Sequence, residues 1–145
     1  MAAKPFVVAP QNYAPALNLV GEQITVLASG EATESYEIFL QRGPEGSGPP
    51  PHSHPWDESF YVTKGEVAFG FGDESATASA GTLVHVPGNT VHWFRFGKDG
   101  EMLSMTSGRE ASKMFADLAR EAAAANFDPG KLAEAGARHG AKIEA

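Results

Sequence analysis

Two histidines and a glutamate, His52, His54 and Glu58, lie close together in the stretch GSGPPPHSHPWDESFYVTKG, residues 46–65. Imidazole and carboxylate groups are strong ligands for divalent transition metals. Residues two apart on an extended strand point to the same face, and Glu58 keeps this parity if the strand stays in register across Pro55. The stretch therefore predicts that one strand, with the bend leading into it, aims two imidazoles and one carboxylate at one point.

A fourth ligand is offered by His92, at the end of a second motif, GTLVHVPGNTVH, residues 81–92. Its Pro-Gly-Asn turn delivers His92 onto the next strand, which in an antiparallel barrel can lie beside the strand that carries Glu58. The four side chains predict a site for one divalent transition metal, with Fe, Mn, Ni, Co, Cu and Zn all suitable. Four protein ligands leave about two positions open on a six-coordinate ion, as a catalytic metal requires.

The overall composition narrows the class of protein. At 145 residues the chain is expected to form one domain, and it contains no cysteine, which excludes thiolate chemistry and is consistent with a reducing compartment. The net charge of −7 argues against a nucleic-acid partner. Prolines interrupt the N-terminal apolar residues and no run approaches ~18 apolar residues, so we expect no signal peptide, no membrane partner and a cytoplasmic location.

Short segments rich in β-branched and aromatic residues recur between turn signals, and the expected strands are 23–29, 35–41, 59–63, 66–71, 74–79, 82–86, 91–96 and 102–106. The polar segment 74–79 is typical of an edge strand. This pattern indicates an all-β sandwich or barrel over residues 21–107. A proline-rich arm, residues 1–20, precedes it and is expected to add an edge strand or to reach a partner subunit.

The last part of the chain, residues 108–145, has a different pattern and predicts a helical tail packed on the barrel. Residues 107–110 (SGRE) are typical of a capping box, and a helical apolar stripe follows at Met114, Phe115 and Leu118. Asp128-Pro129 predicts the start of a second helix, which Gly140 ends.

The two histidine motifs resemble those of small single-domain cupins. The first cupin motif is matched at every position, by Gly46, His52, His54, Glu58 and Gly65. The second motif is matched by Gly81, Pro87 and His92. It departs from the pattern at two positions, where Asn89 replaces a glycine and Phe96 replaces a final asparagine. Asparagine is among the few residues that accept a positive φ. The resemblance covers roughly residues 35–107 and implies an all-β double-stranded β-helix (jelly-roll) cupin barrel with the metal inside, assembled as a homodimer.

Within the cupins, the chain resembles the quercetinase-like monocupins. This resemblance implies a metal-dependent dioxygenase that acts on an enol-forming, flavonol-like small molecule, with Glu58 as metal ligand and as the catalytic base. Two alternatives remain open on the residues. One is a metal-dependent isomerase or lyase that needs no O₂, and the other is a barrel that binds a small ligand without turnover.

Other side chains near the motifs allow two readings. Four apolar residues share the parity of the ligands on their strands and are expected to line a substrate pocket or to fill the core: Phe60, Val62, Phe94 and Phe96. His85 lies in mid-strand between apolar neighbours, which favours a core or interface histidine; if it points inward, it would support a metal ligand from behind. His139, near a helix end, is interpreted as structural, and Arg95 as solvated surface.

Overall fold

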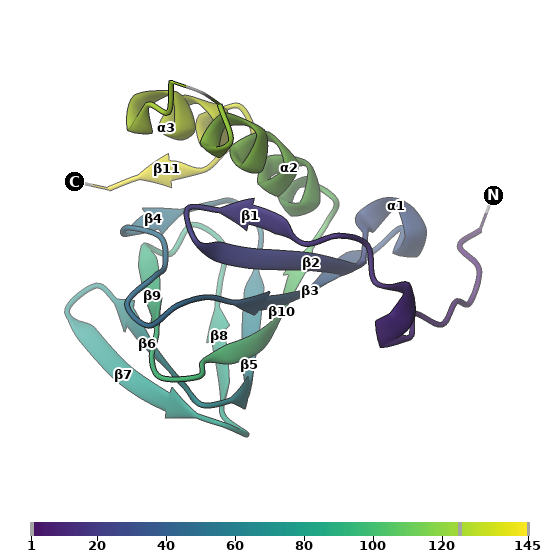
Figure 1. Cartoon of the computed structure of the whole chain (residues 1–145), viewed down its shortest axis with the longest axis horizontal. Coiled ribbons are helices and arrows are strands. Elements are labelled where there is room, and N and C mark those ends of the chain that lie inside the picture. The colour runs from purple at the N-terminus through teal and green to yellow at the C-terminus, as the bar shows by residue number, and fades with distance from the viewer. Residues whose placement is uncertain (1, 125, 145) are drawn as a thin grey trace.

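Two antiparallel sheets face each other and form a barrel in the computed structural model, which describes residues 2–124 and 126–144 (Figure 1). The first sheet has the strand order β1 (Leu17–Leu19), β2 (Glu22–Ala28), β3 (Tyr36–Arg42), β10 (Glu101–Ser107), β5 (Glu58–Lys64), β8 (Leu83–Val86). The second has the order β11 (Lys142–Ile143), β4 (His52–Ser53), β9 (His92–Phe96), β6 (Glu66–Phe71), β7 (Glu74–Ser79). The predicted jelly-roll architecture is confirmed, with β7 at an edge as expected.

The barrel interior is filled by alternate residues of the inner strands, because successive side chains of a strand point to opposite faces. Phe60 and Val62 of β5 are fully buried, and they pack with Phe69 of β6 and Phe96 of β9. This closed apolar core occupies one end of the barrel. The histidines lie at the other end.

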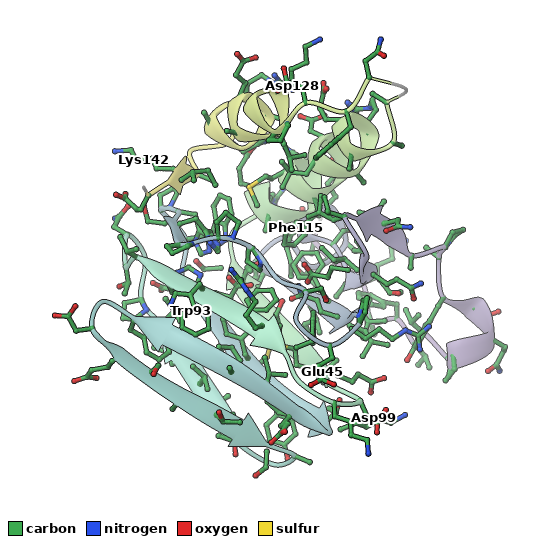
Figure 2. The ribbon with its side chains drawn as sticks, turned by 60° about the vertical axis from the view of Figure 1, so that its left-hand side comes forward. Glu45, Trp93, Asp99, Phe115, Asp128 and Lys142 are labelled. Carbon is green, nitrogen blue, oxygen red and sulfur yellow. The ribbon has the colours of Figure 1, made fainter. Side chains whose placement is uncertain are left out.

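The tail helices pack on the barrel and cover the end where the histidines lie. Figure 1 shows α2 (Glu110–Ala122), α3 (Pro129–Ala137) and β11 together on one side of the barrel, next to β1 and β4. Phe115 of α2 lies between the helices and the barrel (Figure 2), where its ring meets the ring of Phe39 edge-on at 5.0 Å between centroids. A second apolar cluster, which includes Ile24, Phe39 and Met114, joins the helices to the sheet.

The start of α2 is held by a residue far away in the chain rather than by the predicted capping box. Arg109 occupies the N-cap position without a side-chain hydrogen bond. Instead Glu37 of β3, with no exposed surface, accepts one hydrogen bond from the backbone N–H of Ser112 in α2 and another from that of Gly30 in the short helix α1 (Gly30–Thr33), each 2.8 Å long. One buried carboxylate therefore ties both helices to the barrel wall.

The second tail helix begins as the sequence predicts. The Asp128 side chain accepts a hydrogen bond from the N–H of Gly130, and Pro129 is the first helical residue. After α3, the imidazole of His139 is bonded on both sides to carboxylates of α2, 2.6 Å from Glu110 and 2.6 Å from Asp117. His139 thus fastens the two helices together, which agrees with a structural interpretation.

The N-terminal arm divides into two parts. Residues 17–19 form β1, which pairs with β2 at the edge of the first sheet. The residues before it, with the short 3-10 helix η1 (Pro10–Asn12), run away from the barrel and leave Phe6 and Val7 exposed (Figure 1). Among the described helices, none has the length and apolar character needed to cross a membrane.

Candidate metal centre

The candidate ligands come from both sheets. His52 of β4 and His92 of β9 are direct partners across an antiparallel pair in the second sheet, whereas Glu58 begins β5 in the first sheet. The expectations of one continuous strand across Pro55, and of neighbouring strands for Glu58 and His92, were therefore wrong. Proline lacks a backbone N–H and breaks the ladder here, so the chain crosses between sheets within residues 54–57.

The crossing segment is fixed by the turn of the second motif. The backbone N–H of Asn89 donates to the carbonyl of His54 at 2.7 Å, and that of Gly88 donates to Asp57 Oδ1 at 2.8 Å. Asn89 has a φ of +64°, as the sequence predicts for the residue in place of a glycine. The two histidine motifs therefore position each other directly.

The three imidazoles converge on one point. Each of His52, His54 and His92 offers a ring nitrogen, and these nitrogens all lie within 4.8 Å of one another. Glu58 Oε1 lies 3.0 Å from His54 Nε2 and 3.8 Å from His92 Nε2. Two ligands at right angles on an ion with bonds of about 2.1 Å would be about 3.0 Å apart, so the spacing fits a shared ion.

Each imidazole is oriented from behind by a backbone carbonyl. The Nδ1 atoms of His52, His54 and His92 face the carbonyl oxygens of Pro50, Trp56 and Thr90 at 2.9, 3.0 and 2.8 Å. A carbonyl only accepts, so Nδ1 carries the proton in all three rings and Nε2 is the atom left for a metal. The indole of Trp56 also stacks on the His54 ring at 4.5 Å with an interplanar angle of 9°.

The donor set fits a transition metal. His92 is 1% exposed, and its Nε2 has no hydrogen-bond partner among the described residues. A buried polar atom without a partner is uncommon in folded proteins, and an ion would satisfy it. Three imidazoles and a carboxylate suit a borderline divalent cation.

The electrostatics of the site keep two of the candidate ligands, His52 and Glu58, in the forms that bind a metal. Burial lowers the pKa of His52 to about 4, helped by repulsion from His92, so the imidazole is neutral near pH 7. Burial opposes the charge on Glu58, but its close approach to His54 and His92 outweighs burial and lowers the pKa of Glu58 to about 2. Neutral imidazoles and an ionised carboxylate are the ligand forms.

A cavity of about 540 Å³ opens from this centre toward the tail helices. Its wall includes His52, His54 and Glu58 at one end and apolar side chains of β1, α2 and α3 at the other, among them Leu19, Phe115, Leu118 and Leu132. Of the four predicted pocket residues, only Phe94 lines it. Phe60, Val62 and Phe96 are at most 1% exposed and belong to the closed core, which corrects the expectation for these three.

The Gly/Pro loop before His52 forms another part of the wall, contributed by residues 47–50. Arg95 of β9 holds this loop by donating to the carbonyl of Pro49, and it also lies over the ring of Trp93 at 5.7 Å. Arg95 is half-buried, so its assignment to the solvated surface was wrong. Gly48 approaches β9 so closely, at a φ of +151°, that a Cβ would collide with the carbonyl of Phe94.

His85 does not take part in the site. It is exposed on β8, where its Nδ1 lies 2.8 Å from Ser59 Oγ. Both residues are on the face of the sheet that points away from the barrel interior, opposite to Glu58 and Val86, which are buried. The expectation of a core histidine, or of one that supports a metal ligand from behind, is therefore corrected, whereas the alternative of an interface histidine stays a prediction.

Sequence reasoning missed three parts of the cavity. Trp56 and the tail helices were not expected to reach the ligands, and two buried polar residues, Glu22 and Gln41, were overlooked although both line the cavity. A signal existed for Gln41, since it shares the parity of Phe39 on β3 and is therefore expected to point inward. No local pattern indicates that α2 and α3 close the barrel end.

Comparison with known proteins agrees with the architecture. The family model described as Cupin domain matches residues 39–107, the part of the chain that carries all four candidate ligands. The barrel is a jelly-roll cupin barrel. No curated protein matched the sequence.

Solved structures with the same fold have low sequence identity to this chain. KdgF from Halomonas sp. is 19% identical with a TM-score of 0.68, covering 76% of this chain and 99% of that one. The polyketide cyclase RemF from Streptomyces resistomycificus is 14% identical with a TM-score of 0.60, covering 72% and 78%. The nucleoside dehydratase Pac13, from Streptomyces, is 20% identical with a TM-score of 0.60, covering 76% and 88%. At this identity the likeness establishes the fold alone.

Proposed function

We propose that the protein is a metal-dependent dioxygenase that acts on an apolar small molecule able to form an enol. The observation that carries this proposal is the position of Glu58, a carboxylate among three imidazoles at one end of a cavity whose remaining wall is largely apolar. A divalent metal held by these four side chains would polarise a substrate oxygen as a Lewis acid. The apolar wall suits a flavonol-like body better than a sugar or a polyacid.

The residues of this chain have defined tasks in such a reaction. A Glu58 oxygen takes the proton from the substrate enol and leaves the enolate, which is then oxidised by O₂. O₂ is the co-substrate and the source of both oxygen atoms that enter the product, and Glu58 returns the proton when the product forms. Phe94 and the residues of α2 exclude water from the bound substrate.

Oxygen uptake tests the proposal. Metal-loaded protein is mixed with a panel of flavonols and β-diketones in an oxygen electrode, and His54→Ala serves as the ligand variant. The exposed residue His85 provides the matched control, because His85→Ala removes an imidazole on the outer face of the barrel. Uptake should require the metal, be lost in His54→Ala and persist in His85→Ala. Absence of uptake with every compound would refute the dioxygenase.

A second candidate is a metal-dependent isomerase or lyase that uses the same cavity without O₂. It is favoured by a second carboxyl group, Glu22, which lines the cavity with Glu58 and has its pKa raised by burial to about 8. A protonated acid and an ionised base in one cavity suit proton transfers at two points of a substrate. The similar folds named as a cyclase and a dehydratase point the same way. Turnover that continues without O₂ would favour this reading, whereas tight binding without turnover would favour a binding protein.

A further inference from the structure

Two buried polar side chains on the cavity wall have no role in holding a metal. Glu22 of β2 is 5% exposed and Gln41 of β3 is 2% exposed. Gln41 Nε2 donates a hydrogen bond to Glu22 Oε1 at 2.6 Å. Both residues line the same cavity as His54 and Glu58. Two large polar groups in an otherwise apolar wall are costly unless every polar atom finds a partner.

The pair leaves polar atoms unused. Gln41 Oε1 is fully buried and has no hydrogen-bond partner within residues 2–124 and 126–144. In the same part of the chain, Gln41 is the only hydrogen-bonding partner of the Glu22 side chain, and it engages Oε1 alone. The second carboxyl oxygen of Glu22 and the amide oxygen of Gln41 therefore remain for a molecule in the cavity. A ligand group that both donates and accepts hydrogen bonds satisfies them in either orientation of the Gln41 amide.

The carboxyl group of Glu22 can act as a hydrogen-bond donor. Burial raises its pKa to about 8; the hydrogen bond from Gln41 lowers it, and the charge of Glu58 raises it. At pH 7 the group is therefore mostly protonated, and its O–H can donate to an acceptor in the cavity. The subsite formed by Glu22 and Gln41 is therefore neutral, and the negative charge of Glu58 disfavours an anionic group there.

A purely structural role explains this pair poorly. The strands β2 and β3 are already joined by an antiparallel ladder from residue 23 to residue 26 of β2, in which Gln41 lies opposite Ile24. Apolar side chains at positions 22 and 41 would hold the same strands together and would leave no unsatisfied amide. Both residues belong to the cavity wall, where a bound molecule can supply the missing partners.

We propose that Glu22 and Gln41 form a recognition subsite for a neutral group that both donates and accepts hydrogen bonds, such as a carboxamide or a hydroxyl group on an apolar ring. The apolar body of the ligand lies against α2 and α3, and its opposite end reaches Glu58. The inference deepens the proposed function and depends on it only for the end of the ligand at the metal. The substrate is thus a compound with two polar ends, and the end away from the metal is uncharged.

The test compares two probes of the same shape. Benzamide donates and accepts, whereas acetophenone carries a methyl group in place of the amine and only accepts. Dissociation constants are measured by NMR titration of the metal-loaded full chain, and crystals are soaked with benzamide. We expect benzamide to bind about tenfold more tightly than acetophenone, the ratio that about 1.4 kcal/mol produces, with its amide beside Gln41.

Variants separate recognition from folding. Gln41→Leu should remove the preference for benzamide, because it removes the acceptor for the amide N–H. Glu22→Leu removes the O–H that donates to the carbonyl of both probes, so it should weaken both without lowering the melting temperature. Gln23→Leu is the matched control, because Gln23 is exposed on the outer face of β2. A variant that merely loosens the fold would weaken both probes equally, and its melting curve would shift. Equal affinities in the parent, no binding of either probe, or a preference that survives Gln41→Leu would overturn the subsite.

The result is independent of catalysis. A preference for benzamide that is also present in His54→Ala supports the subsite even if oxygen uptake fails. Oxygen uptake without any preference for benzamide leaves the proposed dioxygenase intact and removes the subsite.

Discussion

Replacement of Glu37 by glutamine should destabilise the protein far more than its small chemical change suggests. The two carboxylate oxygens accept one backbone N–H each, from Gly30 and from Ser112. An amide keeps one accepting oxygen and turns an NH₂ group toward the other N–H. One hydrogen bond is lost and two buried donors are left facing each other.

The magnitude follows from the cost of unsatisfied buried groups. Each buried donor without a partner costs about 1–3 kcal/mol, so two of them in Glu37→Gln should lower the free energy of unfolding by about 2–6 kcal/mol. This is a large share of the roughly 5–15 kcal/mol that stabilises a typical domain. Urea unfolding followed by circular dichroism measures the change.

The matched control for this substitution is Glu45→Gln, since Glu45 is an exposed loop residue (Figure 2). The control should change the free energy of unfolding by less than about 0.5 kcal/mol. Hydrogen exchange adds a local readout, because the amides of Gly30 and Ser112 should exchange faster in Glu37→Gln. Equal effects of Glu37→Gln and Glu45→Gln, with unchanged exchange at both amides, would refute the assigned role.

Three further predictions concern the tail, the loop and the outer face of the barrel. Burial disfavours the charged form of His139, but its two carboxylate partners outweigh this and raise its pKa. The parent should therefore be more stable than His139→Asn, with the full difference in unfolding free energy below about pH 6 and a decline as the pH rises through the raised pKa. Urea unfolding at several pH values measures this difference. A pH-independent difference would contradict this. Gly48→Ala should cost about 1–3 kcal/mol in the free energy of unfolding, because of its φ and the collision with β9, and a neutral effect in urea unfolding would contradict the close approach. The expected homodimer should use the outer face of the first sheet, where Leu83 and Met105 are exposed. Light scattering should show twice the mass of one chain for the parent and the mass of one chain for Leu83→Asp. A monomeric parent would disprove the dimer.

The strands could be predicted from the sequence because their signals are local. Alternating apolar residues and turn residues such as Gly65 place the eight expected strands to within one or two positions of the structure, whereas the short strands β1, β4 and β11 were not among them. The four candidate ligands could also be named from the sequence, since their spacing is set by a strand, a bend and a turn. Asp128 and Pro129 likewise mark a helix start with local chemistry.

What could not be predicted depends on contacts between distant segments. The sequence does not show that Pro55 marks a crossing between two sheets, so the arrangement of Glu58 and His92 was misjudged. The role of Glu37 as the acceptor for α2 requires the fold to bring residues 37 and 112 together. Parity alone also cannot separate Phe94, which lines the cavity, from Phe96, which is core, because the difference lies in depth along the barrel.

The most direct test of the central claim, a metal held by His52, His54, Glu58 and His92, is the metal content of the protein. Protein purified without oxygen is examined by elemental analysis, in parallel with His54→Ala and with His85→Ala as the control that removes an imidazole elsewhere. We predict about one transition-metal ion per chain in the parent and in His85→Ala, and almost none in His54→Ala. A substoichiometric metal content in the parent that stays unchanged in His54→Ala would contradict the account.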